Sequence, residues 1–289
     1  MRPFEFVAPE TAEKAVAILA ENSPNAKPLA GGTDMVVDLK HTNAVPKVVV
    51  DLNKIEEFRG IEMTDRGLRI GSLVTHTEIM EHPLVAEHAP AMIDAARTIG
   101  AVQTRNLGTL GGNLVTCVPS LDSGPVLVAL DAEVTVVGND GRRQMPLTEF
   151  FVGPRKTALN PDELLADIIV PTAMLGRATH FLKFGLRKGQ ALALVNGASS
   201  LRLDGGKVAD ARIALGAVAP VVIRAGKAED LVNGTDADEA VLAEAGDLAA
   251  GECKPIDDFR ASADYRRDLV RVLTKRTLET AYAIAKDKG

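Results

Sequence analysis

The sequence AGGTD, Ala30 to Asp34, has a counterpart in TLGGN, Thr109 to Asn113, and these two stretches guide the interpretation of the whole chain. We call them the first and the second glycine stretch. Paired glycines have no Cβ, so backbone amides can approach a ligand closely. Successive amides in such turns form concave anion sites, and the flanking Thr, Asp and Asn side chains add hydrogen-bonding groups. A single Gly-Gly pair would more often be a strand-ending turn. Two such stretches beside apolar strands favour a ligand with two negative groups, such as a diphosphate.

The common nucleotide-binding motifs are absent from the sequence. No three glycines fit G-x-G-x-x-G, and no segment fits the phosphate-binding loop G-x-x-x-x-G-K-[ST]. A dinucleotide would therefore be held by a different scaffold.

Composition excludes several classes of protein. The chain has 289 residues, 46% hydrophobic residues and a net charge of −6, which is unfavourable for binding a phosphate backbone. Aromatic residues make up only 3%, so base-stacking platforms are not expected, and we expect no nucleic-acid partner. Two cysteines are too few for a cysteine-rich zinc or iron–sulfur site, and we expect no metal in this chain. No apolar run approaches about 20 residues and no signal peptide is evident, so we expect a cytoplasmic protein without a membrane span.

The hydrophobic pattern predicts an α+β fold rather than a regularly alternating sheet. Thr11 is expected to cap a helix whose apolar face is Ala12, Ala15, Val16 and Leu19. The turn Gly138-Asn139-Asp140-Gly141 predicts a hairpin. Further strands are expected at 4–7, 47–52, 68–71 and 164–170, an antiparallel meander at 181–218, and helices at 75–81, 90–98, 236–250 and 262–286.

Several segments, in order along the chain, resemble the FAD-binding medium subunit of the molybdenum hydroxylases, the family of xanthine dehydrogenase and carbon monoxide dehydrogenase. The first glycine stretch resembles the family's A-G-G-T-D motif. Residues 100–113 (GAVQTRNLGTLGGN) resemble its second FAD motif, with Leu110 where isoleucine is typical. Similar matches are found at 113–125 (NLVTCVPSLDSGP, with Val118 where serine is common), 181–187 (FLKFGLR) and 262–267 (SADYRR).

The resemblance implies a fold and its division into domains. It implies an FAD-binding domain of the vanillyl-alcohol-oxidase-like type, made of two α/β subdomains, followed by a C-terminal antiparallel sheet with helices. The expected limits are 1–175 for the FAD-binding domain, split near residue 55, and 176–289 for a C-terminal domain of the CO dehydrogenase flavoprotein type.

The resemblance also implies the residues that bind FAD. In the family the two glycine stretches hold the diphosphate, and we expect a valine at Gly32 or Gly111 to remove FAD without unfolding the protein. The acid after the second stretch reaches the sugar part of FAD, and a strand lysine lies near the flavin. The implied cofactor-binding residues are Leu29, Ala30, Gly31, Gly32, Thr33, Asp34, Met35, Ile99, Thr109, Leu110, Gly111, Gly112, Asn113, Asp122 and Lys183.

Taken alone, three of these residues have ordinary interpretations as well. Asp122 could cap the following helix, Lys183 could be a surface charge, and Ile99 could be core packing. No catalytic residue is expected. The histidines His41, His76, His82, His88 and His180 show no ligand spacing, and we interpret them as surface or capping residues.

The implied function is electron transfer through a non-covalently bound FAD. A partner iron–sulfur small subunit would carry two [2Fe–2S] clusters and a large subunit the molybdenum cofactor, often as a dimer of heterotrimers. The FAD would pass electrons to an external acceptor. The alternative is a stand-alone FAD-dependent oxidoreductase with its own substrate site. The substrate would bind a different chain, so this sequence does not identify it.

Overall fold

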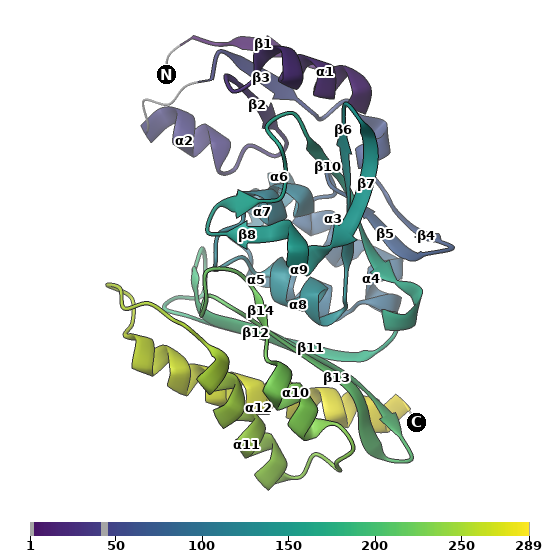
Figure 1. Cartoon of the computed structure of the whole chain (residues 1–289), viewed down its shortest axis with the longest axis vertical. Helices are drawn as coiled ribbons and strands as arrows, with labels where there is room; N and C mark the ends of the chain where they lie inside the picture. Colours follow the sequence, from purple (N-terminus) through teal and green to yellow (C-terminus); the bar gives the residue numbers. More distant parts are fainter. Residues whose placement is uncertain (1–2, 42–45, 289) are drawn as a thin grey trace.

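The computed structural model describes residues 3–41 and 46–288 and has an elongated shape (Figure 1). A small N-terminal unit lies at one end, a central unit of helices and a five-stranded sheet follows, and a third sheet with long helices forms the other end. This arrangement confirms the predicted α+β class, with α/β subdomains followed by an antiparallel sheet with helices.

The N-terminal unit is a three-stranded parallel sheet in the order β1-β3-β2. Its elements are β1 (Glu5–Val7), α1 (Ala12–Asn22), β2 (Ala26–Leu29), α2 (Met35–His41) and β3 (Val48–Asp51). Helix α1 begins as predicted, because the Thr11 side chain accepts a hydrogen bond from the Lys14 amide and its apolar face is buried. The first glycine stretch therefore lies at the carboxyl end of β2, where it connects this strand to α2.

The central unit contains a five-stranded sheet in the order β4-β5-β10-β6-β7. Its strands are β4 (Ile61–Thr64), β5 (Gly67–Gly71), β6 (Glu133–Gly138), β7 (Gly141–Pro146) and β10 (Leu164–Pro171), and η1 (Glu56–Phe58) precedes them. All neighbours pair antiparallel. The predicted hairpin is confirmed, because Gly138 pairs with Gly141, whose φ of 103° suits glycine.

Helices connect β5 to β6 and form the middle of the molecule. They are α3 (His76–Glu81), α4 (Pro83–His88), α5 (Ala91–Thr98), α6 (Val102–Leu107), α7 (Leu110–Thr116) and α8 (Ser123–Ala129). The glycine-punctuated segment 100–113 thus contains a whole helix and the start of another, which its glycines did not suggest. Smaller elements complete the unit: α9 (Leu147–Phe150), β8 (Phe151–Gly153), β9 (Lys156–Thr157) and η2 (Thr172–Met174).

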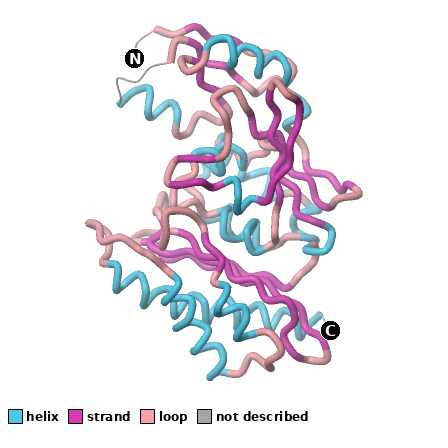
Figure 2. Tube along the Cα trace, viewed as in Figure 1, coloured by secondary structure: helices cyan, strands magenta, loops and turns pink. Residues whose placement is uncertain are grey.

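The C-terminal unit is the predicted antiparallel meander, in the order β11-β12-β13-β14. Its elements are β11 (Ala178–Gly185), β12 (Ala193–Asp204), β13 (Lys207–Gly216), β14 (Ile223–Arg224), α10 (Gly226–Val232), α11 (Glu239–Glu252) and α12 (Ala263–Lys288). Helices α10 to α12 lie on one side of this sheet and α5 and α8 on the other (Figures 1 and 2). Strand β12 is buried from Ala193 to Leu201 because it is covered on both sides.

Apolar side chains gather into three buried clusters, one in each unit. The N-terminal cluster also includes Val137 and Leu164 from the central sheet, so the first two units share apolar packing. Among the described helices, none is both long enough and apolar enough to cross a lipid bilayer.

Candidate functional site

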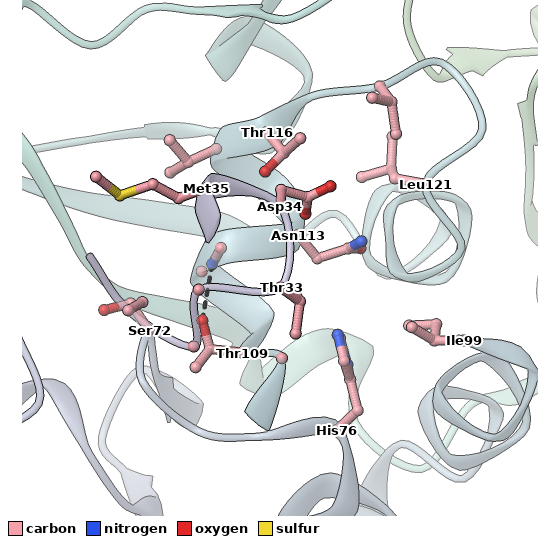
Figure 3. A pocket seen from close by; sticks show the side chains of 18 of the residues that line it. Thr33, Asp34, Met35, Ser72, His76, Ile99, Thr109, Asn113, Thr116 and Leu121 are labelled. Carbon is pink, nitrogen blue, oxygen red and sulfur yellow. Dashed lines mark hydrogen bonds between the residues drawn. The ribbon is translucent and has the colours of Figure 1, made fainter. Parts of the chain in front are cut away.

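A cavity of about 390 Å³ lies between the N-terminal and central units and is bordered by the loop before β12. Both glycine stretches line it, although they are far apart in the sequence (Figure 3). The predicted site residues that line it are Leu29, Ala30, Gly31, Gly32, Thr33, Asp34, Met35, Ile99, Thr109, Gly111, Gly112, Asn113 and Asp122. Leu110 and Lys183 are not in the described lining, since Leu110 is fully buried in the core and Lys183 lies behind Asp122.

The first glycine stretch presents backbone amides that the fold does not use. The amides of Gly31, Gly32 and Thr33 donate to no other described residue. Gly32 has a φ of 72°, a conformation that favours glycine and turns the chain from β2 into α2. Free amides on the wall of a cavity are the donors that a phosphate group requires.

The second glycine stretch uses its amides within the protein. The Leu110 amide donates to the Val74 carbonyl at 2.8 Å and the Gly111 amide to the Ser72 carbonyl at 2.9 Å. The Gly112 amide donates to the Thr109 hydroxyl at 3.0 Å, which makes Thr109 the N-cap of α7. The Asn113 amide donates to the Thr109 carbonyl at 3.0 Å. We expected equivalent turns, but this stretch offers the cavity mainly side chains and the beginning of a helix.

The glycines in the two stretches are required for different structural reasons. A Cβ at Gly111 would lie 2.6 Å from Ser72 Cβ and 2.7 Å from its carbonyl oxygen, so this glycine lets α7 pack on the end of β5. A Cβ at Gly31 would lie 1.8 Å from the Leu107 carbonyl oxygen. A side chain at Gly111 would therefore collide with the protein itself, which argues against the expectation that valine there leaves the protein folded. At Gly32 the nearest atoms are flexible side chains, and the positive φ is the constraint.

Asp122 and Lys183 form a buried ion pair at the cavity wall. Lys183 Nζ donates to Asp122 Oδ2 at 2.5 Å and to the Thr98 carbonyl at 3.1 Å. Asn196 Nδ2 donates to Asp122 Oδ1 at 2.8 Å. Burial raises the pKa of the Asp122 carboxyl, while the Lys183 ammonium and the Asn196 amide act in the opposite direction. Asp122 occupies the N-cap position of α8 but makes no capping hydrogen bond, and the Lys183 side chain is 6% exposed, so neither residue fits its ordinary interpretation.

Ile99 is buried as the core-packing interpretation requires, and its contact with the flavin stays a prediction. It is 9% exposed at the end of α5 and it also lines the cavity. In Figure 3 it faces the same space as Asn113 and His76.

His76 is a cavity residue whose role the sequence analysis missed. It is only 2% exposed, so its interpretation as a surface or capping residue is wrong, whereas His82 does cap α4 by accepting from the Leu84 amide. His76 lines the cavity, its ring points into the space between Thr33, Asn113 and Ile99 (Figure 3), and its Nδ1 is buried without a hydrogen-bond partner. Burial and the nearby Arg105 charge lower the pKa of His76 to about 4. The capping box of Thr75 and Glu78 was the available signal, since it makes His76 the first residue of a helix.

Family models match nearly the whole chain. One described as the FAD binding domain in molybdopterin dehydrogenase matches residues 2–173. Another, described as the CO dehydrogenase flavoprotein C-terminal domain, matches residues 180–281.

Individual relatives match over almost their full lengths. The xanthine dehydrogenase FAD-binding subunit of Escherichia coli O157:H7 is 34% identical over 282 residues, which are 96% of each chain. The carbon monoxide dehydrogenase medium chain of Hydrogenophaga pseudoflava is 34% identical over 281 residues, 97% of each chain. Among solved structures, a carbon monoxide dehydrogenase from Hydrogenophaga pseudoflava superposes with a TM-score of 0.94 at 33% identity, covering 98% of this chain and 99% of that one. Quinoline 2-oxidoreductase from Pseudomonas putida 86 has a TM-score of 0.92 at 29% identity, covering 98% and 99%.

Proposed function

Because this chain belongs to the family of FAD-binding subunits of molybdopterin dehydrogenases, we propose that it is the electron-transfer subunit of a multi-subunit molybdenum hydroxylase. Bound FAD would supply the redox chemistry, taking electrons from [2Fe–2S] clusters of a partner subunit and passing them to an external acceptor. This chain would bind the cofactor, orient it and adjust the charge around it.

The observation that supports this proposal best is the convergence of the two glycine stretches on one cavity. The free amides of Gly31, Gly32 and Thr33 suit one phosphate group. The Asn113 side chain and the start of α7 approach from the opposite stretch. A diphosphate between them would satisfy polar groups that the protein leaves available.

The Asp122–Lys183 pair would serve the flavin and sugar part of the cofactor. Asp122 lines the cavity and can accept hydrogen bonds from sugar hydroxyls. The Lys183 ammonium lies one hydrogen bond behind it, so it would favour negative charge on the bound cofactor through a partly dry site.

The attachment of FAD is proposed to be non-covalent. Neither glycine stretch contains His or Cys that could form a bond to the flavin. Denaturation of the flavin-loaded protein in acid should release yellow flavin into the supernatant. Flavin that remains with the precipitate would contradict non-covalent attachment.

The partners in this proposal are an iron–sulfur small subunit and a large subunit with the molybdenum cofactor. We propose a dimer of such heterotrimers in the cytoplasm. Within this chain we propose domains at 1–175, divided near residue 55, and at 176–289, which the three buried clusters support.

The proposal is tested by asking which chain reduces the flavin. The isolated chain, loaded with FAD, should be reduced by dithionite, with loss of the flavin absorption. It should not be reduced by an aldehyde, a purine, an N-heterocycle or carbon monoxide, whereas the complete complex should be reduced by its substrate. Rapid reduction of the isolated chain by an organic substrate would instead support a stand-alone oxidoreductase.

A further inference from the structure

His76 lies where the two glycine stretches approach each other. Its backbone amide donates to the Gly108 carbonyl at 3.1 Å, directly before the second stretch. A Cβ built on Gly108 would lie 3.5 Å from His76 Cδ2 and 3.6 Å from the Thr33 hydroxyl. The His76 ring and the Thr33 hydroxyl therefore both lie beside Gly108.

The ring has a polar nitrogen that the fold leaves without a partner. Nδ1 of His76 is buried and makes no hydrogen bond within the described chain. Because Nδ1 has almost no accessible surface, it lies away from the cavity and a ligand there does not reach it. Nε2 is bonded to Cδ2, on the ring edge that faces Gly108 and Thr33. It is not among the buried unpaired atoms and no described residue hydrogen-bonds it, so it is the ring nitrogen that a ligand in the cavity can contact.

The charged groups around the imidazole and on the cavity wall are of both signs. Arg105 is the charge that acts on His76, and it helps to keep the ring neutral, with a pKa of about 4. The acidic groups on the cavity wall are Asp34, Asp122 and Glu163, and Asp122 is already paired with Lys183. The second stretch has its backbone amides occupied from Leu110 to Asn113, so its hydrogen-bond donors to the cavity are side chains, and the His76 ring would add one more.

We propose that His76 is a positioning residue for the cofactor diphosphate: a ring nitrogen hydrogen-bonds a diphosphate oxygen, while its backbone amide holds Gly108 at the entrance to the second glycine stretch. This inference rests on the proposed function, since it takes FAD as the ligand. It adds to the diphosphate site a side chain that lies outside both glycine stretches.

Binding should then be coupled to a proton. A phosphate charge beside the imidazole favours its protonated form, so the pKa of His76 is higher with FAD bound than its value of about 4 without it. At pH values between the pKa of His76 in the free protein and its pKa in the complex, the protein takes up a proton when FAD binds. FAD affinity should therefore rise as the pH falls from 7 toward 5, and this part of the rise should be lost when His76 is replaced.

The experiment compares His76→Asn and His76→Leu with the wild type and with His180→Asn. His180 is a suitable control because it is a half-buried histidine whose pKa is also lowered by burial, and it does not line the described cavity. FAD dissociation constants come from quenching of flavin fluorescence across pH 5 to 7. Replacement of His76 should weaken binding roughly 10- to 100-fold at pH 6, the range for a hydrogen bond to a charged group. The control should bind like the wild type.

A second readout observes the diphosphate directly. The ³¹P resonances of bound FAD should move with pH in the wild type and stay constant in His76→Asn over the same range. Chemical denaturation of the apo proteins shows whether each variant is folded, and the wild-type ³¹P titration needs no variant at all.

The outcomes separate this inference from the proposed function. Wild-type protein that binds no FAD would overturn both. FAD binding that is equally tight in His76→Asn, or ³¹P resonances that do not respond to pH, would overturn only the role of His76. Weaker binding with unchanged ³¹P resonances and a shifted flavin absorption would place His76 at the flavin and not at the diphosphate, which also overturns the proposed contact.

Discussion

Gly31 and Gly111 show how single residues bring the two glycine stretches together. Each occupies a position where the backbone or side chain of another segment lies at the place of a Cβ. Gly31 packs on the carbonyl of Leu107, and Gly111 packs on Ser72. These glycines therefore allow the packed segments to approach each other closely. They affect the shape of the cavity through this close approach.

Gly111→Ala should destabilise the protein by about 1–3 kcal/mol, because the added methyl group overpacks the contact with Ser72. Gly251→Ala is the matched control. It lies in α11, where an added Cβ would meet open space, and alanine should raise stability by about 0.5–1 kcal/mol. Urea unfolding of the apo proteins measures both. Unchanged stability of Gly111→Ala together with loss of FAD would restore the simpler view that this glycine only makes room for the ligand.

At the scale of elements, the site depends on polar contacts between segments that are distant in the chain. The Lys183 side chain on β11 connects the end of α5, through Thr98, to the start of α8, through Asp122. Asn196 on β12 joins the same group. The ion pair thus connects the C-terminal sheet to helices α5 and α8.

Lys183→Met should lower the unfolding free energy by about 3–5 kcal/mol, because it leaves the Asp122 carboxylate buried without its cation. The double variant Asp122→Asn, Lys183→Met should recover a large part of this loss, since no charge then remains buried. Lys275→Met, which breaks an ion pair whose Glu239 side chain is 88% exposed, should cost less than about 1 kcal/mol. Urea unfolding compares the loss of unfolding free energy for the two pairs. If Lys183→Met costs no more than Lys275→Met, the Asp122–Lys183 contact does not hold the elements together.

For the whole molecule, the cavity lies where the N-terminal and central units meet. The N-terminal unit provides the first glycine stretch, the central unit provides the second, and the loop before β12 borders the opening. A ligand that spans this cavity contacts all three parts. It should therefore stabilise the folded chain as a single body.

FAD at 100 times its dissociation constant should raise the unfolding free energy by about 2.7 kcal/mol and the Tm by several degrees. The increase should grow with the logarithm of the FAD concentration, because FAD binds the folded chain alone. Riboflavin, which has the flavin but no diphosphate, should give a smaller shift at the same concentration. Differential scanning calorimetry measures both, and equal shifts would argue against the diphosphate as a main contact.

Local chemistry in the sequence was sufficient to predict many of the elements and to identify the two glycine stretches that line the cavity, whereas the other predicted site residues came from the family resemblance. Thr11 and the apolar spacing after it predict α1, and the turn at Asn139 and Asp140 predicts the β6–β7 hairpin. These signals are readable because a cap or a turn involves neighbours a few residues apart. The glycine stretches were identified in the same way.

Tertiary structure alone decided which groups at the site remain available. The strand order β1-β3-β2, the occupied amides of the second glycine stretch and the burial of His76 all depend on contacts with distant segments. Lys183 pairs with a carboxylate 61 residues earlier in the chain, and Gly111 packs on a residue of the preceding strand end. Burial and hydrogen-bond satisfaction are properties of the packed chain, because each depends on which other atoms exclude water from a group. A sequence names the groups, and the fold determines which of them face the cavity with a free hydrogen bond.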